Sequence, residues 1–206
     1  ASEAMRLGRV IVGLVPDEPE AHGLLALMEI QASRNRARRG SDGQPVLLLD
    51  QNRGLWDQIL IRRGLAGLAR VDELGGSSGP YALQAAIAGC HAVARRAEDT
   101  DWGRIAALYD ALSQVAPSPV VEVNRAVALG MAFGPDVGLE LADQLVDVPV
   151  LARYHLLYAV RGDLLAKLGR HDEAAASFRH AAELTRNASE RAVLSRRAEE
   201  SGIAEP

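Results

Sequence analysis

The sequence has 206 residues, of which 48% are hydrophobic and 24% charged, and its net charge of −4 gives no general attraction to nucleic acid or to an anionic membrane. Its single cysteine excludes an internal disulfide framework and a multi-cysteine metal site. No apolar run approaches the ~20 residues of a membrane span, and Glu3, Arg6 and Arg9 make the first residues unlike a signal peptide. We therefore expect a cytoplasmic protein that does not contact a membrane.

Signals for helices dominate the first part of the chain. A helix is predicted over residues 4–15, and Asp17 with Glu20 resembles a capping box that opens a second helix toward Ser33. The apolar residues 46–49 have no partner strand, so a buried loop is expected there.

A segment rich in glycine and serine follows the next helix. This helix is predicted over about 55–74 and ends at residues 75–79, whose composition is typical of a hinge. The sequence therefore predicts an N-terminal helical subdomain (1–74), a hinge (75–80) and a C-terminal region of helical repeats that ends in a capping helix (81–206).

Beyond the hinge, prolines fall where helices are expected to begin. Ser118 is a plausible N-cap with Pro119 at the first helical position, and Asn187 with Glu190 opens the last helix. The helices predicted in this region are 81–96, 101–116, 119–133, 136–147, 150–168, 172–186 and 189–200.

A degenerate repeat relates these helices to one another. Small and large residues between Tyr158 and Ala181 follow the spacing of one tetratricopeptide-like hairpin, and Gly134 and Gly169 each lie between two predicted helices. Gly162 lies inside a helix, where it costs about 1 kcal/mol relative to alanine, so a close approach of two helices is expected there. The predicted fold is all-α, a right-handed α-α superhelix of degenerate tetratricopeptide-like hairpins.

A search for catalytic groups favours structural explanations. Cys90 and His91 are neighbours on a helix and point about 100° apart, which does not suit a nucleophile and its base. Asp99 and Asp101 could bind a cation with His91, but helix capping explains them more simply. The basic run 34–39 could contact phosphate or an acidic partner, although a solvated helix end is the better interpretation. Neither an enzyme nor a cofactor is expected.

One short stretch combines acids, an amide, an arginine and a tryptophan. A structural interpretation makes Trp56 part of the core, Asp50 or Asn52 a helix cap, and Arg53 the ion-pair partner of Asp57. A loop with these side chains could equally be a docking surface for a partner. Both interpretations remain open at this point.

Nine short segments carry a resemblance to a known family: 16–20, 23–28, 47–57, 79–88, 99–102, 105–109, 118–121, 124–128 and 154–157. From about Glu3 to Glu200, the chain resembles the long C-terminal extension of a group of bacterial extracytoplasmic-function RNA polymerase sigma factors, which belong to the sigma-70 family. That extension carries degenerate tetratricopeptide repeats. The turn Phe133-Gly134-Pro135 departs from the resemblance, because a more polar Asp-Gly-Pro turn is expected there.

The resemblance implies a regulatory module that controls transcription initiation from particular promoters. Its implied partners are the RNA polymerase core, the sigma factor's own N-terminal regions, or a signalling protein. Promoter DNA would be contacted only through sigma regions that this chain does not contain. A free-standing repeat scaffold for a peptide or protein is the first alternative, and a sensor of a small ligand or a metal ion is the second.

Docking through a helical groove is the expected mechanism, because the first helix of each hairpin lines the concave side of a stacked array. The alternative is that these side chains form hydrogen bonds between hairpins. The residues predicted to bind a partner are Tyr81, Gln84, His91, Asn124, Arg125, Tyr154 and His155, with Asp50, Arg53 and Trp56 as a second patch.

Overall fold

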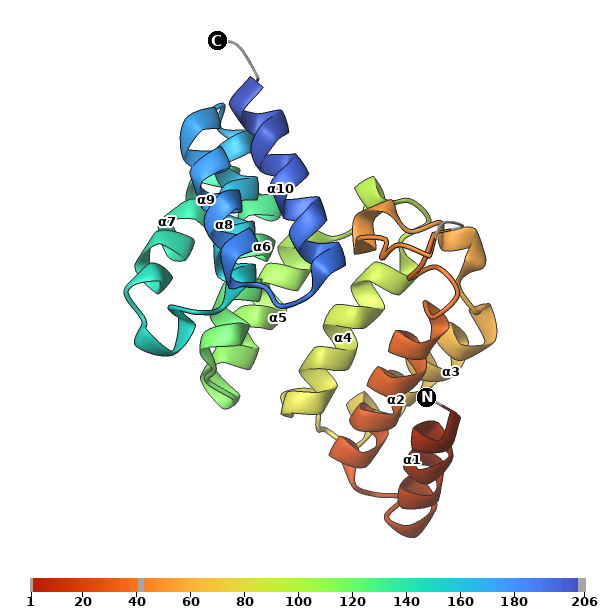
Figure 1. The fold of residues 1–206 in the computed structure, drawn as a ribbon. Coiled ribbons are helices and arrows are strands. Elements are labelled where there is room, and N and C mark those ends of the chain that lie inside the picture. Colours follow the sequence, from red (N-terminus) through yellow and green to blue (C-terminus); the bar gives the residue numbers. More distant parts are fainter. Residues whose placement is uncertain (1, 41–42, 204–206) are drawn as a thin grey trace. The chain divides into compact units, whose positions relative to one another are not determined.

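The computed structural model describes residues 2–40 and 43–203, and in this part of the chain the only extended pairing is an isolated bridge between Arg39 and Pro45. The predicted all-α class is therefore confirmed (Figure 1). None of the helices in these residues combines the length and the apolar character needed to cross a membrane. The α-helices are α1 (Ser2–Leu14), α2 (Pro19–Ser33), α3 (Gln58–Glu73), α4 (Pro80–Val93), α5 (Trp102–Val115), α6 (Pro119–Phe133), α7 (Pro135–Val146), α8 (His155–Lys167), α9 (His171–Leu184) and α10 (Ala188–Ile203), and the 3-10 helices are η1 (Leu48–Asp50), η2 (Arg53–Leu55), η3 (Ala97–Asp99) and η4 (Pro149–Leu151).

The chain divides into two compact units, Ala1–Ala116 and Pro117–Pro206, called here the N-terminal and the C-terminal unit. The boundary lies between α5 and α6, and not at the glycine-rich segment 75–80 where the sequence predicts it. Local composition misleads here, because α4, which follows this segment, packs against α2 and α3, which precede it.

The segment after α3 is a tight turn that belongs to the N-terminal unit. Gly75 adopts a left-handed φ of +71°, a conformation that favours glycine and that commonly ends a helix. Gly76 packs directly against the side chain of Pro19, and Gly79 against that of Glu20. The small residues thus let the turn lie on the start of α2.

The N-terminal unit is organised around α2, which packs against α1, α3 and α4 (Figure 1). Ile30, Val71 and Ala85 are among the side chains buried in this unit. At the crossing of α2 and α4, a Cβ atom on Gly23 would lie 2.8 Å from the backbone nitrogen of Ala82. Glycine at this position therefore sets the close spacing of the two helices.

The C-terminal unit consists of the hairpins α6–α7 and α8–α9, followed by α10, which packs on α9. The close approach expected at Gly162 is confirmed, because a Cβ atom there would lie 2.7 Å from the ring of the buried Phe178. Gly169 joins α8 to α9 with a φ of +71°. The hairpin predicted between Tyr158 and Ala181 is therefore present.

Most predicted helix starts are correct. Pro80, Pro119 and Pro135 each occupy the first turn of a helix, and Ser118 is the N-cap residue of α6. The side chain of Asn187 accepts a hydrogen bond from the backbone N–H of Ser189 at 3.0 Å. The predicted helix 150–168 is an exception, because it divides into η4 and α8.

Two local predictions are wrong. The N-cap of α2 is Glu18, and Glu20 directs its carboxylate to another helix instead of completing a capping box with Asp17. The apolar segment 46–49 is not a buried loop, because Leu47 and Leu49 are exposed and the segment runs into η1.

Candidate docking groove of the N-terminal unit

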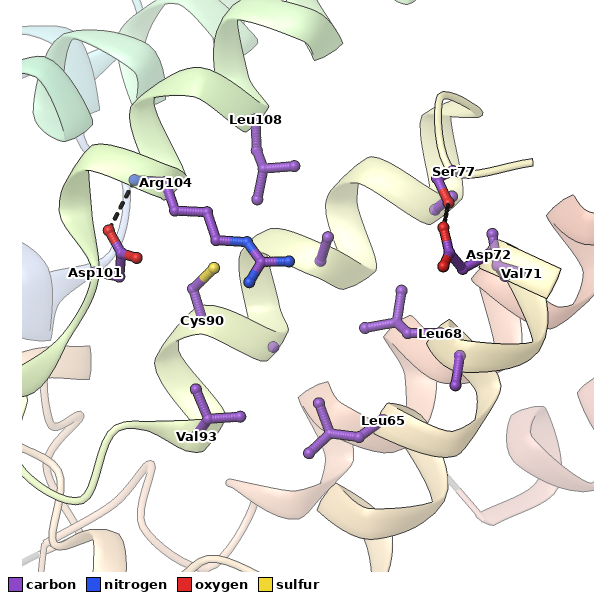
Figure 2. Close-up of a pocket in the computed structure, with 14 residues that line it drawn as sticks. Leu65, Leu68, Val71, Asp72, Ser77, Cys90, Val93, Asp101, Arg104 and Leu108 are labelled. Atoms are coloured by element: carbon purple, nitrogen blue, oxygen red, sulfur yellow. Dashed lines mark hydrogen bonds between the residues drawn. The ribbon is translucent and has the colours of Figure 1, made fainter. Parts of the chain in front are cut away.

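A groove of about 470 Å³ lies between α3 and α5, and α4 forms its floor (Figure 2). We call it the docking groove. The floor is made mostly of small residues, while leucines stand on both walls. Its lining consists of Leu65, Leu68, Ala69, Val71 and Asp72 of α3, Ser77 of the turn, Ala82, Ala86, Gly89, Cys90 and Val93 of α4, Asp101, and Arg104 and Leu108 of α5.

The floor helix α4 contains no Asp, Glu, Lys or Arg, and distant side chains complete both of its ends. At its N-terminus, the carboxylate of Glu20 accepts hydrogen bonds from the backbone N–H groups of Tyr81 (2.9 Å) and Ala82 (3.0 Å). At its C-terminus, the guanidinium of Arg53 donates to the carbonyl oxygens of His91 and Ala94, the latter at 3.0 Å. Both charges oppose the end charges of the helix dipole, so both contacts stabilise α4.

Polar groups mark the two ends of the docking groove (Figure 2). At one end Asp72 accepts a hydrogen bond from the hydroxyl of Ser77 at 2.9 Å. At the other end Asp101 caps α5, as the sequence predicts, by accepting from the backbone N–H of Arg104 at 2.9 Å. The side chain of Arg104 extends from α5 into the groove beside Cys90. Burial raises the pKa of the Cys90 thiol, and the positive charge of Arg104 partly opposes this effect.

The predicted patch around Trp56 is a core cluster and not a docking surface. Trp56 is 4% exposed and packs with Ala37 and Ile61. Arg53 lies over the Trp56 ring, 4.8 Å from its centroid, and its hydrogen bonds go to α4 and its surroundings rather than to Asp57. The structural interpretation is therefore correct for Trp56.

The remaining residues of this stretch cap helices or stay on the surface, and the cap of α3 is Asp57 rather than the expected Asp50 or Asn52. Asn52 caps η2 by accepting from the N–H of Gly54 at 2.9 Å, and Asp57 caps α3 by accepting from the N–H of Ile59 at 2.9 Å. Asp50 is exposed on η1. Of the predicted second patch, Asp50 is exposed, Arg53 is half-buried and Trp56 is buried.

Arg34 is a part of this cluster that the sequence does not reveal. It belongs to the basic run 34–39, which is predicted to be a solvated helix end, yet its guanidinium lies 5.8 Å from the centroid of the Trp56 ring. Burial lowers the pKa of Arg34 to about 10, and repulsion from Arg38 and Arg53 adds to the effect. Ala37 is buried as well, while Arg36, Arg38 and Arg39 are exposed, so the solvated interpretation holds for these three arginines.

His91 is buried and cannot present its ring to a partner at the surface. It is 8% exposed and meets Trp102 edge-on, with 5.2 Å between the ring centroids. Burial lowers the pKa of His91 to about 4, and the charges of Arg34 and Arg53 act in the same direction. A neutral, enclosed imidazole of this kind supports the packing of α4 on α5.

The cation site considered for His91, Asp99 and Asp101 does not form. Asp99 pairs with Arg96 at 3.1 Å, while Asp101 is engaged as a helix cap. Among residues 2–40 and 43–203, no three His, Cys, Asp or Glu side chains are grouped as a metal ion would require.

Tyr81 and Gln84 lie on α4 but outside the lining of the docking groove. Tyr81 is exposed, whereas the amide of the half-buried Gln84 donates to the carbonyl oxygen of Pro80 at 3.1 Å. Tyr81 thus remains available to a partner, and Gln84 is partly used within its own helix.

The other predicted residues belong to the C-terminal unit. Arg125 pairs with Glu122 at 3.1 Å, and the ring nitrogen Nε2 of His155 lies 3.2 Å from the carboxylate of Glu190. The first pair lies within α6, whereas the second connects α8 to α10 and so agrees with the alternative of contacts between helices. Asn124 is exposed, and Tyr154 is half-buried next to His155.

A second, shallower hollow of about 440 Å³ lies on the C-terminal unit. Tyr158 and His180 meet edge-on within it, with 4.3 Å between their ring centroids. Arg161 and Asp143 form an ion pair at 2.6 Å on its rim. Arg161 is thus already paired, whereas Arg104 in the docking groove has no ion-pair partner among the described residues, so we regard the docking groove of the N-terminal unit as the better candidate.

The fold and the groove define an all-helical protein built from packed helical hairpins. Residues 1–72 match a family of unknown function (DUF6596). The chain is also similar to an uncharacterized protein of Rhizobium meliloti (strain 1021), with 45% identity over 192 residues that cover 93% of this chain and 45% of the relative. The chain therefore spans less than half the length of the curated relative that it matches.

Proposed function

We propose that this chain is a regulatory docking module of an extracytoplasmic-function sigma factor, and that it modulates promoter-specific transcription by contacting the polymerase core, the sigma factor's own N-terminal regions or a signalling protein. The nine segments that resemble such extensions support the proposal. The length of the relative is compatible with it, because more than half of that protein lies outside the matched stretch and leaves room for sigma regions.

The docking groove is the observation that carries the docking role. It is open, its floor is made of small side chains, and Leu65, Leu68 and Leu108 offer apolar contacts on its walls. Hollows of this kind, lined by three helices, are suited to hold an apolar segment of another protein. Function then lies in a surface and not in a catalytic centre.

Transcription with the full-length protein tests this proposal. Deletion of residues 1–206 is expected to change transcription from the target promoter at least several-fold, because the regulatory contact is lost. The matched control is Arg63→Gln, an exposed residue of α3 outside the groove, which should leave transcription unchanged. Equal transcription with and without residues 1–206 would refute the sigma-factor role.

A free-standing scaffold is the second candidate function. The regular hairpins α6–α7 and α8–α9 favour it, because such pairs are typical of repeat proteins that hold peptides. This alternative predicts partner binding by the chain together with unchanged transcription in the deletion experiment.

A further inference from the structure

We infer that the docking groove binds an amphipathic helix that carries a carboxylate in its C-terminal half, held by Arg104. The inference rests on the proposed docking function and names the chemistry of the partner. Two observations carry it: the shape of the groove and the position of one unpaired charge.

The shape of the groove matches a helix. Its lining follows α4 from Ala82 to Val93, and the eleven steps of 1.5 Å between these two residues give a length of about 16 Å, or three helical turns. The floor positions Ala86, Gly89 and Cys90 have small side chains, which allow the backbone of an incoming helix to come close. Leucines on both walls can pack against apolar residues spaced three and four positions apart.

The charge of Arg104 gives the site its specificity. Within the described part of the chain, no carboxylate lies within ion-pair distance of its guanidinium, and the nearby Asp101 binds the backbone N–H of Arg104 instead. The side chain nevertheless extends over the floor toward Cys90 (Figure 2). A helix seated in the groove would shield this guanidinium from water, so it must bring an acceptor, and a carboxylate can bind a guanidinium through two parallel hydrogen bonds.

The two ends of the groove also fix a direction. Asp72 lies at the end where α4 begins, and Arg104 lies nearer the end where α4 finishes (Figure 2). Asp101 also lies at that second end, but its carboxylate is engaged as the cap of α5, so the guanidinium of Arg104 is the group left there to attract a carboxylate. The positive N-terminus of a bound helix is therefore favoured near Asp72, and its negative C-terminal half near Arg104. The bound helix should run in the same direction as α4.

A display library of 14-residue peptides tests the inference. The library fixes apolar residues at helical spacing, randomises the polar positions, and is selected on the 206-residue chain. Enriched peptides should carry Glu or Asp in the C-terminal half. The best clone should bind at least about tenfold more tightly than its Glu→Gln version. Arg104→Gln should abolish this difference, while Arg63→Gln, on the opposite side of α3, should preserve it.

An engineered thiol gives an independent readout of occupancy. Ala69 lines the groove and is exposed, whereas the native Cys90 is only 6% exposed, so the readout uses Ala69→Cys in a Cys90→Ser background. The best clone should slow alkylation of this thiol, and Ala86→Leu, which fills the floor, should prevent both binding and protection. The inference is overturned if no peptide is enriched, if Glu and Gln peptides bind equally, or if the thiol is not protected. The alkylation assay is repeated with decanoate, a small amphipathic acid. If decanoate protects the thiol and no peptide is enriched, the ligand of the groove is a small acid of this kind and the inference is overturned.

The failure of this inference can be separated from the failure of the proposed function. If deletion of residues 1–206 alters transcription but Arg104→Gln in the full-length protein does not, the module regulates through another surface. If selected peptides bind as expected but the deletion has no effect, the groove is correctly described and the sigma-factor role is wrong.

Discussion

Replacement of Gly23 by alanine tests the close crossing of α2 and α4. The new Cβ atom would lie 2.8 Å from the backbone nitrogen of Ala82 and 3.1 Å from its Cα, whereas ordinary contacts of a Cβ atom begin at about 3.4 Å. Because the neighbour is backbone and not a flexible side chain, the two helices must move apart. Overpacking of this kind costs roughly 1–3 kcal/mol.

The same displacement weakens a second contact. Glu20 lies one turn before Gly23, and its hydrogen bonds to the start of α4 measure 2.9 and 3.0 Å. Loss of a helix cap costs about 1 kcal/mol, while alanine regains about 1 kcal/mol of helix propensity over glycine. The two smaller effects cancel, so Gly23→Ala should destabilise the N-terminal unit by about 2 kcal/mol.

Tryptophan fluorescence during urea unfolding measures this effect selectively. Both tryptophans, Trp56 and Trp102, belong to the N-terminal unit, so their emission reports on that unit alone. The matched control is Gly13→Ala in α1, where a Cβ atom meets nothing within 4 Å. This control should be neutral or stabilising by up to about 1 kcal/mol. Equal stability of the two variants would refute the steric reasoning.

Three further substitutions are predicted to change stability. His91→Gln should reduce the pH dependence of the stability of the N-terminal unit. Folding lowers the pKa of His91 from 6.5 to about 4, so the free energy of unfolding falls as the pH drops below 6.5. Between pH 7 and pH 5, wild type should therefore lose roughly 2 kcal/mol more than the variant in urea unfolding. Gly162→Ala should destabilise the C-terminal unit by about 1–2 kcal/mol, because its Cβ atom would meet the Phe178 ring at 2.7 Å. Unfolding followed by circular dichroism measures this effect, and the control Gly202→Ala, whose Cβ atom has its nearest neighbour at 4.0 Å, should not destabilise the unit. Glu20→Ala should cost about 1 kcal/mol through loss of the α4 cap, and an unchanged urea midpoint would contradict that role.

The helices could be predicted from the sequence because their signals are local. Prolines at the first turn and caps such as Asn187 and Asp101 act within three or four residues, and the structure has them at the expected positions. The close approach of two helices at Gly162 could also be predicted, since a glycine inside a helix is compensated by a close neighbour.

Contacts between distant segments could not be predicted in the same way. Glu20 has the spacing of a local capping residue, but its carboxylate binds N–H groups more than 60 residues further along the chain. Arg34 likewise reaches Trp56, and its charge reaches His91, only after the chain has folded, so a patch that looks exposed in the sequence becomes core. The docking groove was missed for the same reason, because three helices contribute to its lining.

The contacts of Glu20 and Arg53 with the two ends of α4 determine which fragment of the chain can form the groove. All residues of the groove lining fall between Leu65 and Leu108, which suggests that a short fragment would suffice. Such a fragment would lack Glu20 and Arg53, and its floor helix would have uncompensated ends and no charged residue of its own. A transferable binding unit must therefore reach back at least to Glu20, and the compact unit Ala1–Ala116 contains the groove together with both of these end contacts.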